Sequence, residues 1–330
     1  MDFELSMEQE ILRKTVRSFA EKEIAPVAQE LDEKEKFSLD TCRAMGELGL
    51  FGMVVSEPYG GQEMDYVSYI IAVEELARID GSHAATVAAG NSLGIGPLYY
   101  YASEEQKKKY LPKLCTGQHL WGFGLTEPNA GSDAGGARTT AVLDGNEWVL
   151  NGSKIFITNA SAPNSLGVTV MAKTGTREDG RGSELSCILV EHGTKGFEAK
   201  EMHGKMMWRS SNTSELYFDD CRVPKGNLLG QQGKGFHQML ETLDAGRLSI
   251  GAMGLGGAQG AYEIAMRYAK EREQFGRPIG SFQINAFKLA DMAMEIEAAR
   301  LLLYKACWLK DHHKPFGKLA AMGKLYCSEV

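Results

Sequence analysis

Trp121-Gly-Phe-Gly-Leu-Thr-Glu-Pro-Asn-Ala-Gly-Ser-Asp133, followed after two turns by Asn151-Gly-Ser-Lys-Ile-Phe-Ile-Thr-Asn159, is the part of the sequence that decides the fold. The first half is rich in glycine and turn-forming residues, as in loops that present backbone N–H groups to phosphates and ring edges. The second half has the period of a strand. The sequence on both sides follows helical periodicity. This order predicts a β-unit between two helical blocks, with a planar cofactor held at their junction.

Hydrophobic periodicity divides the chain into three domains, at 1–120, 121–228 and 229–330. The first opens on a capping box, Ser6 with Gln9, ahead of an apolar helical stripe. In the second, the period falls to two, and Asp144-Gly145 and Asn151-Gly152 both suit type I′ hairpin turns. We therefore expect an α+β fold, with an N-terminal all-α domain, a middle antiparallel β-domain that forms a meander, and a C-terminal helical bundle.

The last domain is expected to contain three helices: from Gly235 onward, from Ser281 to about Lys310, and after Pro315. The second of these is apolar on most sides, which is typical of a helix buried in a bundle. The third is still running at Val330. We therefore expect the bundle to be incomplete, with a C-terminal part of the parent protein absent from this sequence.

Composition narrows the classes of function. The chain has 36 basic and 43 acidic residues, a net charge of −7, which argues against nucleic acid as a partner. No apolar run is long enough to span a bilayer, and the N-terminus lacks the basic and apolar regions of a signal peptide. Six cysteines without CxxC spacing indicate reduced thiols in a cytosol-like compartment. No histidine motif predicts a metal site.

Two groups of polar residues in the middle domain have both a functional and a plain interpretation. Phe156 and Thr158 share one face of a strand, where they could cover and hydrogen-bond a flat ring, while Ile155 and Ile157 face the core. An ordinary half-exposed strand has the same pattern. Thr126 and Ser132 flank a loop suited to phosphates or ring edges, and a plain turn fits that loop equally well.

The last domain carries two further candidates. Asp244 and Arg247 are three apart on a helix, so they form either a clamp for phosphate or carboxylate, or a surface pair. Arg272-Glu-Gln-Phe275 precedes a break between helices. Gly254-Leu-Gly256-Gly-Ala-Gln-Gly260 is similar to a dinucleotide fingerprint, but it follows a helical stretch, which favours close helix packing. Without a nucleophile or metal motif, we expect a bound organic cofactor to supply the catalytic chemistry.

Together these stretches resemble the FAD-dependent acyl-CoA dehydrogenase family of short-, medium- and branched-chain type, over essentially the whole chain. The motifs occur in the family's order: Leu125–Asp133, Asn151–Asn159, Leu243-Asp-Ala-Gly-Arg247, Arg272-Glu-Gln-Phe-Gly276 and Phe282-Gln283. The resemblance implies α,β-dehydrogenation of an acyl-CoA thioester to the trans-2-enoyl-CoA. It also implies FAD as hydride acceptor, an electron-transfer flavoprotein as electron partner and a homo-oligomer, commonly a tetramer. The implied location is cytoplasmic, or the mitochondrial matrix for a processed eukaryotic protein.

The resemblance also implies residue roles. The expected flavin-ring contacts are Phe123, Leu125, Thr126, Phe156 and Thr158. Ser132 is expected at the boundary between the flavin phosphate and acyl-CoA. Asp244 and Arg247 are expected to contact acyl-CoA. The residues expected to reach the FAD of a neighbouring subunit are Arg272, Phe275 and Gln283.

The catalytic base has no candidate in this sequence. Family members use either a Glu just before the Arg of the Leu-Asp-x-x-Arg motif, which here is Gly246, or a Glu far downstream. We therefore expect the base beyond Val330. Ala88, Ala89 and Gly90 lie where relatives floor the acyl pocket, and their small size leaves room for medium or branched acyl chains.

Two other functions remain open at this point. An acyl-CoA oxidase, or another oxygen-using flavoenzyme of the same fold, would be distinguished by rapid reoxidation of its reduced flavin in air. A non-catalytic relative that binds FAD or nucleic acid is disfavoured by the net charge of −7 and by the presence of Asp244 and Arg247.

Overall fold

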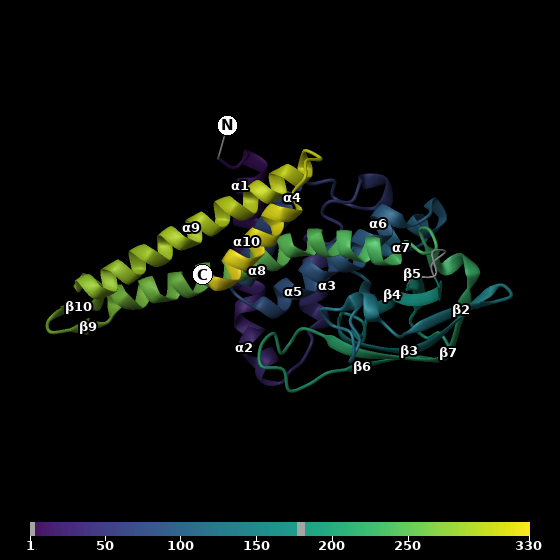
Figure 1. The fold of residues 1–330 in the computed structure, drawn as a ribbon. Coiled ribbons are helices and arrows are strands. Elements are labelled where there is room, and N and C mark those ends of the chain that lie inside the picture. The colour runs from purple at the N-terminus through teal and green to yellow at the C-terminus, as the bar shows by residue number, and fades with distance from the viewer. Residues whose placement is uncertain (1–3, 177–181) are drawn as a thin grey trace. The chain divides into compact units, whose positions relative to one another are not determined.

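The computed structural model describes residues 4–176 and 182–330 (Figure 1). The chain separates into two compact units. The helical unit comprises residues 1–29, 65–85 and 247–330, and the sheet unit comprises residues 30–64 and 86–246. Three of the four boundaries between them fall within the helices α2 (Ala25–Glu33), α5 (Gly81–Ala89) and α8 (Gly235–Glu271), and the fourth falls just before Asp65.

The helical unit is built from long helices whose ends carry the signals read from the sequence. Ser6 and Gln9 form the expected capping box at the start of the first helix. Asp65 caps the helix that begins at Tyr66, because its carboxylate accepts from the backbone N–H of Ser68 at 2.6 Å. Its elements include α1 (Met7–Phe19), η1 (Ala20–Ile24), α4 (Tyr66–Ala77), the short strands β9 (Glu273–Gln274) and β10 (Arg277–Pro278), η6 (Ile279–Ser281), α9 (Gln283–Asp311) and α10 (Gly317–Glu329). The three expected C-terminal helices are α8, α9 and α10.

Glycines of α8 bring its backbone close to neighbouring segments of the helical unit. A Cβ atom added at Gly254 would lie 2.5 Å from the carbonyl oxygen of Cys327, and one at Gly256 would lie 2.3 Å from that of Glu74. A Cβ atom added at Gly260 would lie 2.2 Å from the carbonyl oxygen of Arg78. The glycine-rich run is therefore a helix-packing surface within a helix, which confirms the rejection of a dinucleotide fingerprint.

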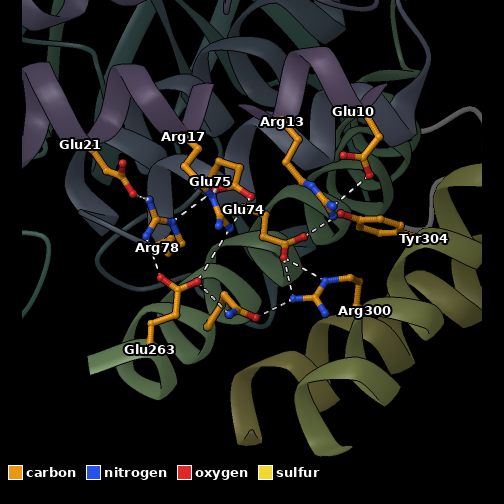
Figure 2. A network of polar contacts seen from close by, with 11 residues as sticks. Glu10, Arg13, Arg17, Glu21, Glu74, Glu75, Arg78, Glu263, Arg300 and Tyr304 are labelled. Carbon is orange, nitrogen blue, oxygen red and sulfur yellow. Dashed lines mark hydrogen bonds and ion pairs between the residues drawn. The ribbon is translucent and has the colours of Figure 1, made fainter. Parts of the chain in front are cut away.

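Figure 2 shows a network of ion pairs that links helices of the same unit. At its centre Glu74 of α4 accepts from Arg300 Nη2 at 2.9 Å and from the Tyr304 hydroxyl at 2.8 Å, both on α9. Burial raises the pKa of Glu74, against the opposing charge of Arg300. The other pairs are Arg17 with Glu75 (2.8 Å), and Arg78 with Glu21 (2.5 Å) and Glu263 (2.8 Å). Because each buried glutamate pairs with an arginine, the attraction between the two charges offsets the cost of removing them from water.

In one respect α9 differs from expectation. The prediction of a helix buried on most sides is wrong for its N-terminal half, because its buried residues, Ile296 to Cys307, lie in the C-terminal half. There it packs against α4 and α10. Further toward its N-terminus the exposed apolar side chains include Ile284, Phe287 and Met294. Apolar periodicity indicates that a face will be covered, but it does not indicate whether the same chain covers it.

The sheet unit combines helices with one eight-stranded sheet. Its helices are α3 (Leu39–Glu47), η2 (Glu57–Tyr59), η3 (Gly90–Ile95), α6 (Gly96–Tyr101), α7 (Glu104–Cys115), η4 (Ala134–Gly136) and η5 (Lys225–Asn227). The strands are β1 (Leu120–Gly124), β2 (Thr140–Asp144), β3 (Glu147–Thr158), β4 (Ser165–Thr176), β5 (Ser183–Glu191), β6 (Phe197–Glu201), β7 (Thr213–Pro224) and β8 (Leu228–Leu229). The α+β class with a middle β-domain is therefore confirmed.

The sheet runs in the order β6-β7-β3-β2-β4-β5-β8, and β1 pairs with β4. Its pairs are antiparallel except for those of β1 and β2 with β4. One expected turn is present between β2 and β3, where Gly145 has φ of 61°. The turn expected at Asn151-Gly152 is absent, because both residues lie within β3, so the pattern of a simple meander is wrong there.

The interior of the sheet carries the core of this unit. Trp148 and Leu150 are buried on β3, against Val168 and Val170 on β4 and Ile188 on β5. All six cysteines of the chain are buried and free. Among the described residues, no helix is both long and apolar enough to cross a membrane.

Candidate active site

A cavity of about 140 Å³ in the sheet unit brings together five residues singled out from the sequence. The cavity lies where β1, the loop after it and the end of β3 meet η3 and the first turns of α8. Its walls are formed by Ala89, Leu93, Trp121, Phe123, Leu125, Thr126, Phe156, Ile157, Thr158 and Leu243. The five are therefore neighbours in space although they come from two separate stretches.

Close backbone packing fixes the wall formed by β1. A Cβ atom added at Gly94 would lie 2.6 Å from the carbonyl oxygen of Trp121, so only glycine lets η3 approach β1 this closely. The Trp121 indole N–H donates to the Thr169 hydroxyl at 2.9 Å. The wall beside β1 is formed by Ala89, the last residue of α5, and by Leu93 of η3, a π-helix of the kind often found at functional sites.

Phe156 stands in an unusual backbone conformation on the strand wall. Its φ is 63°, and its side chain is 62% exposed. The register of β3 against β7 shifts between Lys154 and Ile157, so this segment is a bulge rather than a regular strand. Ile157 is buried in the core of the sheet, as expected, and it also lines the cavity beside Phe156 and Thr158. Large residues at positive φ are strained, and such strain concentrates at functional sites.

A buried ion pair connects the loop wall to the strand wall, and the sequence reasoning missed it. Lys154 Nζ lies 2.8 Å from Glu127 Oε1 and donates to the carbonyl oxygen of Leu125 at 3.1 Å. The side chains of Lys154 and Glu127 are 0% and 5% exposed. No local signal marked it, because the first motif contains both Glu127 and Asp133, the second contains Lys154, and such residues are usually solvated.

The two charges of this pair are shifted by burial and by each other. Burial lowers the pKa of Lys154, and the Glu127 carboxylate opposes that effect. Burial alone would raise the pKa of Glu127, but the hydrogen bond and charge of Lys154 outweigh it and hold that pKa below its ordinary value. Each group of the pair therefore favours the charged form of the other.

The structure does not place the expected acyl-CoA residues on the walls of this cavity. Ser132 is exposed in the loop between β1 and β2. Asp244 and Arg247 are half-buried on α8, one on each side of the boundary between the two units. Leu243, which precedes Asp244, does line the cavity.

The three residues expected to serve a neighbouring subunit lie around the hairpin of β9 and β10, at one end of the helical unit (Figure 1). Arg272 directly precedes β9, Phe275 lies between the two strands, and Gln283 begins α9. Arg272 and Gln283 are exposed, and Phe275 is 94% exposed with φ of 53°. Phe275 contacts Phe282 edge to face, with ring centroids 6.1 Å apart. An aromatic side chain held this far into solvent has the exposure that a contact with another molecule requires.

The chemistry of the cavity suits a flat, largely apolar ring with polar edges. Its lining combines aromatic and aliphatic side chains with the hydroxyls of Thr126 and Thr158, and none of these lining residues is charged. At about 140 Å³ it is smaller than the roughly 300–1,000 Å³ of complete ligand sites. These residues therefore form one wall of a site rather than the whole of it.

Three family models match the chain: the acyl-CoA dehydrogenase N-terminal domain over residues 6–118, the middle domain over 122–221 and the C-terminal domain over 233–330. The chain is 51% identical to the probable acyl-CoA dehydrogenase YngJ of Bacillus subtilis (strain 168), over 100% of its own length and 86% of that protein.

Two solved structures are similar in fold. One, on the electron transferring flavoprotein of Acidaminococcus fermentans, contains a chain 45% identical to this one with a TM-score of 0.95, covering 100% of this chain and 86% of that chain. The other is a glutaryl-CoA dehydrogenase of Mycobacterium smegmatis in complex with FADH2, which is 33% identical with a TM-score of 0.91. The match covers 98% of this chain and 81% of that chain.

Proposed function

The chain belongs to the acyl-CoA dehydrogenase family, and from this premise we propose that it oxidises an acyl-CoA thioester to the trans-2-enoyl-CoA. The observation that carries the proposal is the single cavity lined by Phe123, Leu125, Thr126, Phe156 and Thr158. Bound FAD supplies the acceptor for the hydride of the β carbon, and an electron-transfer flavoprotein receives the electrons.

The residues of the cavity suit the ring of FAD in their chemistry. The hydroxyls of Thr126, from the loop, and Thr158, from the strand, would hydrogen-bond its polar edge. The exposed ring of Phe156 is suited to cover one of its faces. Leu125 and Phe123, which are both buried, would shield the ring from water. We assign Ser132 to the boundary between the flavin phosphate and the acyl-CoA.

Substrate contacts are proposed on α8. Asp244 and Arg247 lie three residues apart and so project on the same side of that helix. Arginine suits the phosphates and carbonyls of a CoA ester because its planar group donates several hydrogen bonds. In the cavity, Ala89, Leu93 and Leu243 provide an apolar surface without a charge. We therefore expect uncharged aliphatic acyl chains, medium or branched, to be preferred over acyl chains that end in a carboxylate.

No residue that lines the cavity can act as the base that removes the α-proton, because none is a carboxylate. Gly246 is buried beside the cavity, and a Cβ atom there would lie 3.4 Å from Leu93 Cδ2. We propose that the carboxylate arrives from elsewhere, and that the missing side chain at Gly246 leaves space for it. Exchange of the α-proton of a bound acyl-CoA is the measurement that reports this group.

The partners and location of the protein complete the proposal. We propose a homo-oligomer, commonly a tetramer, in which Arg272, Phe275 and Gln283 reach the FAD of a neighbouring subunit; their exposure supports this. We propose a cytoplasmic location, or a mitochondrial matrix one for a processed eukaryotic protein. The six free cysteines support a reducing compartment. The domains are proposed at 1–120, 121–228 and 229–330.

Two measurements test the function. In an assay coupled to an electron-transfer flavoprotein, specificity constants are compared for butyryl-, octanoyl-, isovaleryl- and glutaryl-CoA. We expect turnover of the uncharged chains and little of glutaryl-CoA. The reduced flavin is then mixed rapidly with air. Slow reoxidation is expected of a dehydrogenase, whereas reoxidation at the rate of turnover would establish an oxidase instead.

A further inference from the structure

The buried charges of the sheet unit raise a question of function because stability alone does not explain them. Lys154 and Glu127 are almost fully removed from solvent, and their charged atoms lie 2.8 Å apart. Transfer of two charges from water into the interior costs about as much as their attraction returns, so apolar residues would stabilise the fold as well. The best-attested use of such pairs is to specify one geometry among several.

Within the described residues, the hydrogen bonds of the two charged groups lead to the loop that follows β1. Lys154 Nζ donates to the carbonyl oxygen of Leu125 at 3.1 Å, where the loop begins. The carboxylate of Glu127 accepts from the backbone N–H groups of Arg138 at 2.7 Å and Thr139 at 3.0 Å, where the loop ends. The ion pair therefore ties both ends of the loop to one position on β3.

The next residue of β3 adds a second tie at the same place. The backbone N–H of Ile155 donates to the carbonyl oxygen of Thr126 at 2.9 Å. Two successive carbonyls of the loop, those of Leu125 and Thr126, are thus held by two successive residues of the strand. Phe156 follows immediately, in the bulge with φ of 63°. The contacts of residues 154 and 155 therefore hold the loop wall of the cavity against the bulge that presents Phe156.

We propose that Lys154 and Glu127 are positioning residues that hold the hydroxyl of Thr126 and the ring of Phe156 in register for the bound flavin. This inference rests on the proposed function, since it takes the cavity to be the flavin site. The pair itself does not line the cavity, so it acts through Leu125, Thr126 and the bulge rather than by touching the ring. Loss of one charge should make the position of the cavity wall less fixed, although the substitution changes none of the residues that line the cavity.

The test compares Lys154→Met, Glu127→Gln and the double variant with the wild type, each purified with FAD. The readouts are the affinity for FAD, the resolved bands of the flavin's visible spectrum, and kcat and KM with octanoyl-CoA. We expect each single variant to blur the spectral bands and to lower kcat roughly ten-fold or more, with KM nearly unchanged, because misplacement of reacting groups costs rate. The double variant should be no worse than the worse single variant, as for residues that act as a unit.

Arg300→Met is the matched control. It also leaves a buried carboxylate, Glu74, without its arginine, but neither residue lines the cavity. We expect it to lower the unfolding midpoint while the spectrum and kcat per bound flavin stay at wild-type values. If Lys154→Met does not fold, Glu127→Gln carries the test, because its amide oxygen can still accept from the backbone of Arg138 or Thr139.

Two failures are distinguishable. If the wild type binds FAD but acyl-CoA does not reduce it, the proposed function fails, and the spectral comparison of variants still decides the role of the pair. If the wild type is reduced, and the variants lose only stability while keeping its spectrum and kcat, the pair is merely structural and the inference is overturned.

Discussion

At the scale of single residues, Phe156 combines strain with exposure. A phenylalanine at φ of 63° that buries little of its ring contributes little to the stability of the fold by itself. The hydrogen bonds and the ion pair just before it hold the backbone in this state. Phe156 lies on the wall of the cavity, where we propose that its ring contacts the flavin.

Replacing Phe156 by glycine and by alanine separates backbone strain from ring contact. Both variants lose the ring, so both should bind FAD more weakly by a similar factor. Glycine tolerates positive φ, and alanine does not, so Phe156→Gly should exceed Phe156→Ala in free energy of unfolding by about 1 kcal/mol. Urea unfolding of the apoproteins measures the difference. Equal stabilities would show that residue 156 is not held at positive φ.

Glu127 predicts a dependence of stability on pH. Its pKa in the folded state lies below the ordinary value of 4.5, so its contribution is complete above about pH 6 and is lost as pH falls through 4.5 toward the folded pKa. The difference in unfolding free energy between wild type and Glu127→Gln should therefore shrink on acidification. In a Lys154→Met background burial remains while the charge and hydrogen bond of Lys154 are lost, so that difference should be smaller near neutral pH. A difference independent of pH and of Lys154 would contradict the ion pair.

Sequence reasoning identified the residue types of the cavity but not what holds them. The shared strand face of Phe156 and Thr158 follows from a period of two, and the roles of Phe123 and Leu125 came from the family resemblance. Positive φ at Phe156 could not be predicted, because a bulge depends on pairing with β7. The Lys154 pair was missed, since lysine and glutamate are almost always solvated and nothing local marks these two as buried.

At the scale of elements, α8 was the most predictable and β3 the least. A long helix from Gly235 follows from helical periodicity, and its glycine run was correctly assigned to packing. In β3 the dipeptide Asn151-Gly152 has the local chemistry of a hairpin turn, yet pairing with β7 continues on both sides of it. Gly152 has φ of 143° and packs on Thr139, where a Cβ atom would lie 2.7 Å from the backbone. Tertiary pairing therefore outweighed turn propensity.

Adjacent glycines of α8 provide a direct test of the packing surface. Gly256→Ala places a Cβ atom 2.3 Å from the carbonyl oxygen of Glu74, whereas Gly257→Ala meets nothing within 4 Å. The first should lower the free energy of unfolding by about 1–3 kcal/mol through overpacking, and the second should raise it by up to about 1 kcal/mol through helix propensity. Thermal or urea unfolding distinguishes them. Equal effects would contradict the close approach.

At the scale of the whole molecule, the exposed apolar side chains of α9 and the aromatic tip at Phe275 predict assembly. We expect the natural protein to sediment as a multiple of its subunit mass, with Phe275→Ala retaining the assembly but losing FAD more readily. The subunit of this sequence has a mass of 36.1 kDa. Sedimentation velocity with detection at the flavin's absorption band measures both properties. A monomer that retains FAD fully would contradict the shared site.

The overall α+β order was predictable because the change of period from 3.6 to 2 and back is a property of the sequence alone. The division into compact units was not, because segments 1–29, 65–85 and 247–330 join through contacts distant in sequence. The exposure of the N-terminal half of α9 was likewise not predicted, because periodicity does not specify what covers an apolar face.

The central claim is that the cavity wall of Thr126, Phe156 and Thr158 belongs to a flavin site for acyl-CoA oxidation. The most direct measurement is an anaerobic titration of the natural, FAD-loaded protein with octanoyl-CoA, with the visible flavin spectrum recorded and the product identified. The account predicts bleaching of the oxidised flavin bands and formation of the trans-2-enoyl-CoA. A flavin that stays oxidised with excess octanoyl-, butyryl- and isovaleryl-CoA would contradict it.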